Sequence, residues 1–257
     1  MNPFTSPCSE CQHSGKVIPP CPNSNSTSPK IVMVAQAPGS GALCSRHICR
    51  YNWHLKPNDV TARRIDWVFH CLGVQDSDLL IVNALRCANQ CVCYHECEKA
   101  ENTKRTRIEY ERCSWALREV IAPQYPKVIL LMGQAAKQAF CDAFKDHPDI
   151  QVMGNLDWET TVAFGESTVT LLSHPGQLGL NARWDRHIRR DRGDDKCKKS
   201  LVFLRDVEVA LKQRFSQFVL NSPVPSLQEF NKSHSADSIY PECSCHKHPG
   251  NPSAKRE

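Results

Sequence analysis

Residues 31–41 read IVMVAQAPGSG, a continuous apolar run that passes directly into a turn rich in proline and glycine. Similar apolar runs occur at residues 79–83, 127–132 and 168–172. A strand without polar alternation is typical of a parallel sheet whose two faces are both covered by helices. These four runs therefore predict the strands of one buried, mostly parallel sheet.

Helical spacing of apolar residues separates most of these runs, and a further helix is predicted after the last one. The predicted helices cover residues 60–73, 106–121, 134–144 and 200–215. A hairpin-like segment is expected at roughly residues 150–165. Strands that alternate with helices predict the fold class α/β, here a three-layer αβα sandwich around a central, mostly parallel four-stranded sheet.

The regions that flank this pattern differ in composition. Residues 1–29 are rich in Ser, Pro and Asn and are interpreted as an irregular arm, and residues 216–257 as a disordered tail. Residues 30–215 form the predicted domain, with a polar, cysteine-rich insertion at 88–105. The 257 residues of the chain suffice for one sizeable α/β domain with tails.

The chain has a net charge of +5 and contains 15 cysteines. Its first thirty residues hold no apolar segment of the signal-peptide kind, and no run approaches the ~18 apolar residues of a membrane helix. We therefore expect an intracellular protein of a reducing compartment (cytoplasm, nucleoid or nucleus) with no membrane partner. There, metal ligation explains the cysteines better than disulfides do. Cys71 and Cys141 lie in helix-like runs and are interpreted as core residues or plain thiols.

Four other cysteines stand in an arrangement that suits a metal site. Cys8 and Cys11 form a CxxC pair, Cys87 follows a predicted strand, and Cys113 opens an amphipathic stretch. Two close cysteines and two distant ones, each beside a core element, are typical of four-cysteine iron–sulfur or zinc sites. The pattern by itself leaves both metals open.

Polar or turn residues follow three of the predicted strands, at 36–39, Asn83 and His174. Each has an ordinary explanation, as a turn, a helix cap or a structural histidine. The carboxyl ends of parallel strands meet at one edge of the sheet, however, and ligands of such sheets bind at that edge. Together, these residues predict a shared pocket.

With these motifs in this order, the chain resembles the uracil-DNA glycosylase superfamily, closest to its iron–sulfur class, often called family 4. The resemblance covers roughly residues 8–215. Besides the cysteines, it rests on AQAPG at 35–39, NALRC at 83–87, PKVI at 126–129, MG at 132–133 and HP at 174–175.

The resemblance implies a uracil-DNA glycosylase-like fold and a hydrolase that cleaves the N-glycosidic bond of uracil, or of a related modified pyrimidine, in DNA. Such an enzyme acts in base excision repair, on single- or double-stranded DNA, and extrudes the target base from the stack. We expect it to act as a monomer. The resemblance also implies a structural [4Fe–4S] cluster held by Cys8, Cys11, Cys87 and Cys113.

The same resemblance assigns roles to the residues at the strand ends. The amide of Asn83 matches O4 and N3–H of uracil, and His174 can donate to the anion that develops at O2. Gln36 would orient the attacking water. The other base-binding candidates are backbone groups and aromatic side chains near the first loop, at Ala37, Gly39, Tyr51 and Trp53.

The DNA-binding candidates lie in the loop after the histidine, at Gln177, Leu178, Leu180 and Arg183. In this superfamily such a loop wedges into the minor groove, and a leucine can fill the space that the flipped base leaves. Residues 183–199 contain eight Lys or Arg residues against four Asp residues, which suits phosphate contact as well as an ordinary solvated loop.

The chain also departs from the pattern. Gln36 replaces the family's glutamate and cannot accept a proton from water. The segment after Cys87 is long, so that Cys97 could replace Cys113 as a cluster ligand, and the family's base-stacking phenylalanine has no clean match. The same segment adds Cys91, Cys93 and His95. The tail motif CSCHKH at 243–248 could bind zinc, although chance or opportunistic metal binding is the simpler explanation. Three alternatives stay open: a glycosylase for another modified base, a non-catalytic iron–sulfur protein that binds nucleic acid, and a zinc protein.

Overall fold

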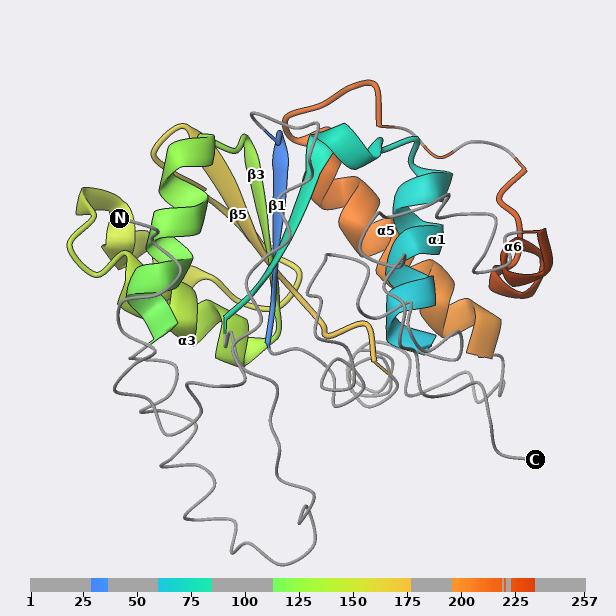
Figure 1. Cartoon of the computed structure of the whole chain (residues 1–257), viewed down its shortest axis with the longest axis horizontal. Coiled ribbons are helices and arrows are strands. Elements are labelled where there is room, and N and C mark those ends of the chain that lie inside the picture. The colour runs from blue at the N-terminus through green and yellow to red at the C-terminus, as the bar shows by residue number, and fades with distance from the viewer. Residues whose placement is uncertain are drawn as a thin grey trace, which may run out of the picture.

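The computed structural model describes residues 29–36, 60–84, 113–176, 196–218, 220 and 223–233 (Figure 1). Within these ranges five strands form one sheet in the order β2-β1-β3-β5-β4. The first four strands of that order run parallel to their neighbours, and β4 is antiparallel to β5. The strands are β1 (Ile31–Ala35), β2 (Leu79–Asn83), β3 (Val128–Met132), β4 (Thr161–Phe164) and β5 (Ser167–Leu172).

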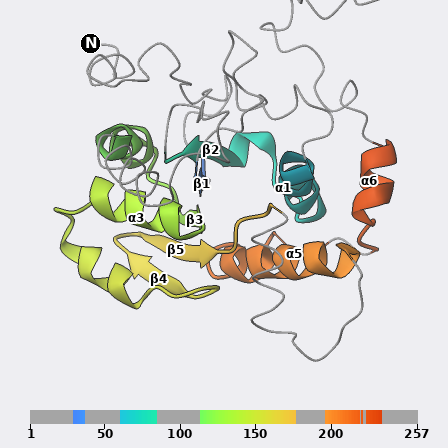
Figure 2. The same cartoon turned by 90° about the horizontal axis from the view of Figure 1, so that it is seen from below.

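Helices cover both faces of the sheet. Figure 1 shows α3 on one side of the strands and α1 with α5 on the other, and Figure 2 shows the same separation from below. None of the helices in the described ranges is long and apolar enough to span a membrane. The helical elements are α1 (Val60–Cys71), α3 (Gln134–Ala143), α5 (Lys196–Lys212), α6 (Leu227–Ser233), a helix at residues 113–121, and the 3₁₀ segments η5 (Asp76–Asp78), η6 (Ala122–Gln124) and η7 (Pro148–Asn155).

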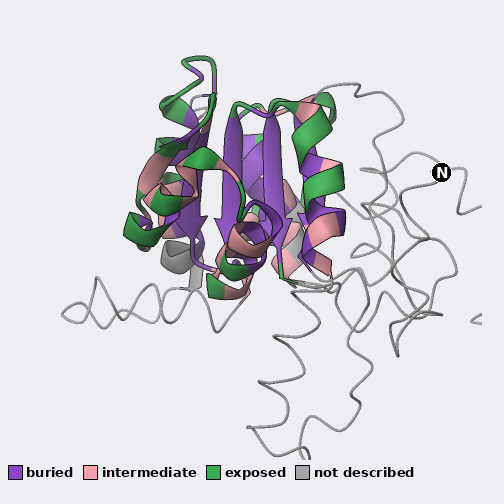
Figure 3. Cartoon of the chain, turned by 90° about the vertical axis from the view of Figure 1, so that its left-hand side faces the viewer, coloured by how far each residue is buried: buried purple, intermediate pink, exposed green. Residues whose placement is uncertain are grey.

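The two faces of the sheet carry separate hydrophobic cores. Ile31 and Met33 of β1 belong to the cluster that packs on α1, α5 and α6, which we call the α1 core. Val32 and Val34 belong to the cluster that packs on α3 and the helix at 113–121, which we call the α3 core. Because both faces of β1 are buried, the strand has no polar alternation. Figure 3 shows the buried strands between helices with exposed outer surfaces, which confirms the predicted three-layer α/β sandwich.

The prediction of four strands is wrong by one strand. β4 forms a hairpin with β5 through a turn that contains Gly165, whose φ is +56°. Its residues are mostly half-buried or exposed, and Thr161 Oγ1 shares a hydrogen bond of 2.8 Å with Thr170 Oγ1. A short edge strand with little apolar character gives a weak sequence signal, although it lies in the segment expected to be hairpin-like.

The expectation of a disordered tail from residue 216 does not hold for the described part of that region. Phe218 and Phe230 are buried in the α1 core. The indole N–H of Trp67, on α1, donates a hydrogen bond of 2.9 Å to the carbonyl of Pro225. Ser226 and Glu229 form a reciprocal capping box at the start of α6. The segment from 223 to 233 is therefore part of the folded domain.

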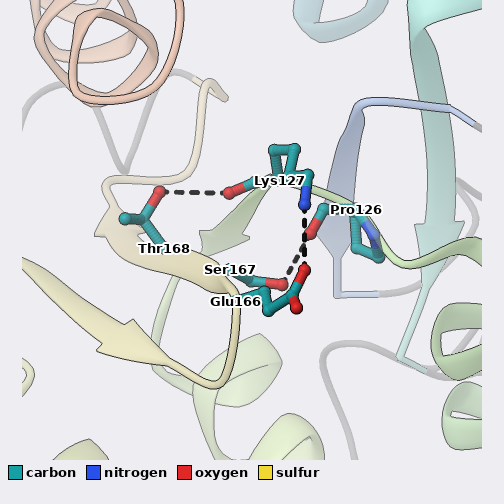
Figure 4. Close-up of polar contacts among 5 residues, drawn as sticks. All are labelled: Pro126, Lys127, Glu166, Ser167 and Thr168. Carbon is teal, nitrogen blue, oxygen red and sulfur yellow. Dashed lines mark hydrogen bonds and ion pairs between the residues drawn. The ribbon is translucent and has the colours of Figure 1, made fainter.

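Polar contacts close the amino-terminal edge of β3 and β5 (Figure 4). Lys127 Nζ lies 3.1 Å from Glu166 Oε2, and Ser167 Oγ donates to the carbonyl of Pro126 at 2.6 Å. Thr168 Oγ1 donates to the carbonyl of Lys127 at 3.3 Å. These groups therefore satisfy one another at this edge of the sheet.

Candidate active site

The carboxyl-terminal edge of the sheet brings together the residues that follow the parallel strands. Ala35 pairs with Asn83 across β1 and β2, and the N–H of Ala84 donates to the carbonyl of Ala35 at 2.8 Å. On the other side of β1, Met132 pairs with Leu172, which precedes His174 by two residues. Gln36 and His174 therefore follow β1 and β5, and Asn83 ends β2, at the same edge of the sheet.

Asn83 and His174 also lie on the same face of the sheet. Side chains alternate along a strand, and both Ile81 and Leu172 point into the α1 core. The side chain of Asn83, two residues after Ile81 in the same strand, therefore lies on the α1 side. His174 lies beyond the end of β5, and its loop is held on the same side because Arg64 of α1 binds the carbonyl of Pro175. β2 and β5 are three strand positions apart in the sheet, which places their backbones ~14 Å apart at the usual strand spacing.

The side-chain oxygen of Asn83 is buried and has no hydrogen-bond partner among the described residues. A buried amide oxygen without a donor costs on the order of 1–3 kcal/mol. Most buried polar groups in folded proteins have a partner, so such an exception needs an explanation. A ligand that supplies an N–H to this oxygen provides one.

The tautomer of His174 follows from its hydrogen bond to the backbone. The N–H of Gly176 donates to His174 Nδ1 at 3.0 Å. A nitrogen that accepts a hydrogen bond carries no proton, so the neutral imidazole carries its proton on Nε2. The imidazole can therefore donate a hydrogen bond through Nε2 without becoming charged.

Side chains from two other elements hold the residues beside His174. Ser173 Oγ donates to Glu159 Oε1 at 3.0 Å, and Arg64 of α1 donates to the carbonyl of Pro175. Arg64 Nε also donates to Ser200 Oγ on α5 at 2.9 Å. Neither Arg64 nor Glu159 was predicted as a site residue from the sequence. One feature of the sequence does single out Arg64. It lies four residues before the buried Val68, so that a charged residue falls on the apolar side of α1.

Gln36 is exposed directly after β1. Its carboxamide can donate and accept hydrogen bonds but cannot take up a proton. The other candidates of the first loop, Ala37, Gly39, Tyr51 and Trp53, lie outside the described residues, and so do Gln177, Leu178, Leu180 and Arg183.

Of the four predicted cluster ligands, Cys113 is described. It is half-buried, lies in the helix that includes residues 113–121 and packs against the α3 core. Within the described ranges, no group of three Cys, His, Asp or Glu residues is placed to hold a metal ion. The other candidates, which are Cys8, Cys11, Cys87, Cys91, Cys93, His95, Cys97 and the motif at 243–248, lie outside these ranges.

Two further cysteines behave as core residues. Cys71 is buried in the α1 core, and burial raises the pKa of its thiol to about 11. Cys141, on α3, packs against the α3 core, and burial raises its pKa as well. Both thiols are therefore protonated at neutral pH. A protonated, buried thiol agrees with the interpretation of Cys71 and Cys141 as core residues.

The comparison with protein families agrees with this geometry. The sequence model of the Uracil DNA glycosylase superfamily matches residues 22–198, which is more than half of the 257-residue chain. The comparison with curated proteins gives no match. The matched range contains the whole parallel sheet and the edge that carries Gln36, Asn83 and His174. With its strands, its edge residues and most of its length inside that match, the chain belongs to the uracil DNA glycosylase superfamily.

Proposed function

We propose that this protein is a monofunctional uracil-DNA glycosylase of the iron–sulfur type. Members of its superfamily are hydrolases that release bases from DNA during repair. The bond from C1′ to N1 breaks, the base leaves with the bonding electrons, and water adds to C1′ of the deoxyribose and loses a proton. The observation that carries the proposal is the buried Asn83 oxygen, which lacks a donor among the described residues, on the same face and edge as His174.

Asn83 supports selection of uracil. Its Oδ1 can accept from N3–H of uracil while its amide N–H donates to O4, so that both amide groups are satisfied. Cytosine presents an acceptor at N3 and a donor at N4, which leaves both pairs mismatched. A site built around buried polar groups rejects a mismatched ligand strongly, because each unpaired group costs on the order of 1–3 kcal/mol.

His174 supports stabilisation of the leaving base. As the glycosidic bond breaks, negative charge spreads to O2 of the base. A neutral imidazole that carries its proton on Nε2 can donate to that oxygen without giving up the proton. A fixed donor of this kind contributes on the order of 10²–10³ in rate.

Gln36 supports a water-orienting role. Its carboxamide can hold the attacking water but cannot remove a proton from it. The water proton then passes to solvent or to the departing base after the bond has broken. Because bond breaking precedes most of the attack, the missing general base slows the reaction by ~10²-fold and does not abolish it.

The proposed [4Fe–4S] cluster on Cys8, Cys11, Cys87 and Cys113 is structural, and it would brace the N-terminal arm and the insertion against the sheet. Cys113 is half-buried beside the α3 core, a position that suits a ligand between the sheet and an added segment. A cluster of this kind fits the reducing intracellular compartment in which the protein would meet DNA. The basic stretch at 183–199 would hold phosphates, and the protein would act as a monomer.

A glycosylase for another modified pyrimidine is the second candidate, and Gln36 favours it. At this position the carboxamide could donate a hydrogen bond to the base, which a glutamate cannot do. In that case Gln36 would recognise the base and would not orient the attacking water.

The proposal is tested by incubating the purified protein with oligonucleotides that each carry one lesion, followed by alkaline cleavage at abasic sites. We expect cleavage with uracil and none with cytosine or thymine at the same position. Cleavage only with another modified pyrimidine would support the second candidate. No cleavage with any lesion, together with binding to the same oligonucleotides, would indicate a non-catalytic protein that binds nucleic acid.

An absorbance spectrum of anaerobically purified protein tests the cluster separately, because an iron–sulfur cluster is coloured and zinc is not.

A further inference from the structure

Arg64 is a buried cation that ties three separate segments together. Its side chain leaves α1 in the first turns of the helix, and the residue is 4% exposed. Its Nη1 donates to the carbonyl of Pro175, in the loop after β5, and its Nε donates to Ser200 Oγ on α5 at 2.9 Å. The guanidinium therefore fixes the loop that follows His174 to both helices that cover this face of the sheet.

Both of these contacts are to neutral acceptors. Among the described residues no carboxylate pairs with Arg64, and burial lowers the pKa of its guanidinium. Burying a charge is costly, and an apolar side chain of similar size often fills such a site at lower cost. Packing alone is therefore a weak reason for an arginine at this position. The guanidinium group, however, is planar and carries several N–H donors, which suits it to hold two acceptors at fixed positions.

The held loop is the one that sets the tautomer of His174. Ser173 is anchored to Glu159 on one side of the histidine, and Pro175 is anchored to Arg64 on the other. The next residue, Gly176, supplies the N–H that occupies His174 Nδ1. The carbonyl that Arg64 binds and the N–H that Gly176 donates belong to the same peptide unit, so fixing one fixes the other.

We infer that Arg64 is a positioning residue for His174. By binding the Pro175 carbonyl, it orients the peptide between Pro175 and Gly176 so that the Gly176 N–H points at Nδ1 and the imidazole proton stays on Nε2. The effect on the histidine is independent of the reaction. The effect on catalysis rests on the proposed function, in which Nε2–H stabilises the leaving base.

The test uses Arg64→Leu and Arg64→Lys in the full chain, with Lys127→Ala as the control at the opposite edge of the sheet. The first readout is the ¹⁵N spectrum of the histidine rings, in which His174→Gln identifies the signals of His174. We expect a protonated Nε2 in wild type and in Lys127→Ala, and a mixture of tautomers in Arg64→Leu. Arg64→Lys, with a single ammonium, should restore the wild-type tautomer in part.

The second readout is uracil release. We expect Arg64→Leu to lower kcat by about 10- to 100-fold with KM within about twofold, since a displaced catalytic group costs that much. If Arg64→Leu does not fold, Ser200→Ala removes one anchor and should shift the tautomer in the same direction. A wild-type tautomer in folded Arg64→Leu, or in folded Ser200→Ala where Arg64→Leu does not fold, overturns the inference, whether or not activity falls. If wild type is inert on every lesion, the proposed function fails, and the ring spectrum still decides the role of Arg64.

Discussion

Gly176 lies so close to His174 that a side chain at position 176 would collide with the imidazole. A Cβ at this position would stand 2.9 Å from His174 Nδ1 and 3.2 Å from its Cε1. The same residue donates its N–H to Nδ1 at 3.0 Å. The absence of a side chain at 176 is therefore what allows the backbone to reach the ring.

We expect Gly176→Ala to lower the single-turnover rate of uracil release by about 10-fold or more, because the added methyl group displaces the ring from its position. The melting temperature should change little. Gly154→Ala is the matched control, because a Cβ at residue 154 would meet nothing within 4 Å. Equal rates for Gly176→Ala and wild type would show that the position of His174 does not control the reaction.

Gln36→Glu separates the two roles proposed for this side chain. If Gln36 orients water, a glutamate adds a proton acceptor, and the rate on uracil should hold or rise by up to ~10²-fold. If Gln36 donates to a modified base, the carboxylate cannot replace that hydrogen bond, and the rate on the true substrate should fall. Single-turnover rates of both proteins on uracil and on a panel of modified pyrimidines distinguish these outcomes.

The strands and the edge residues could be predicted from the sequence because their signals are local. The strand predicted at 127–132 is Val128–Met132 in the structure, and the strand predicted at 168–172 is Ser167–Leu172, so each differs by one residue at its start. Polar residues at or directly after the ends of such runs lie at the carboxyl edge once the sheet is parallel, and the strand pairing puts Gln36, Asn83 and His174 at that edge.

The contacts of Arg64 and Glu159 could not be predicted in this way. Arg64 meets residues 111 and 136 positions away in the chain, and only the packing of α1 against the sheet and α5 brings them together. Helix α6 did have a local signal, since SLQE at 226–229 is a capping-box sequence. The surrounding segment is rich in Ser and Pro, however, and this composition favoured the interpretation of a disordered tail.

The packing of α6 predicts that the C-terminal segment contributes to stability. Phe230 is 3% exposed in the α1 core and lies 5.2 Å from the ring of His70, centroid to centroid. Phe230→Ala should lower the free energy of unfolding by ~3 kcal/mol, the usual cost of deleting a buried aromatic ring. Urea unfolding measures this change, with the exposed Lys232→Ala as the control. A difference below ~0.5 kcal/mol would mean that α6 does not stabilise the domain.

Glu208 on α5 gives a prediction of pH dependence. Burial alone would raise the pKa of Glu208, but hydrogen bonds from Lys212 and Arg205 outweigh burial and lower it. A lowered folded-state pKa stabilises the protein above the unfolded-state value of 4.5, and this contribution is lost as the pH falls through the folded-state value. Glu208→Gln should therefore destabilise the protein by ~1 kcal/mol at pH 7, and the difference from wild type should shrink in acid. A difference that stays constant down to the acid transition would contradict the charged interaction.

The oxygen of Asn83, which has no hydrogen-bond partner among the described residues, is proposed to accept a hydrogen bond from N3–H of uracil. The most direct measurement is the single-turnover release of base from oligonucleotides that carry uracil or cytosine at one position, for wild type and Asn83→Ala. We predict release of uracil and not of cytosine by wild type, and a loss of ~10²-fold or more on uracil in Asn83→Ala, whose folding is checked by its melting curve. Equal rates of uracil release for wild type and Asn83→Ala, or no release of uracil by wild type, would overturn the role proposed for Asn83.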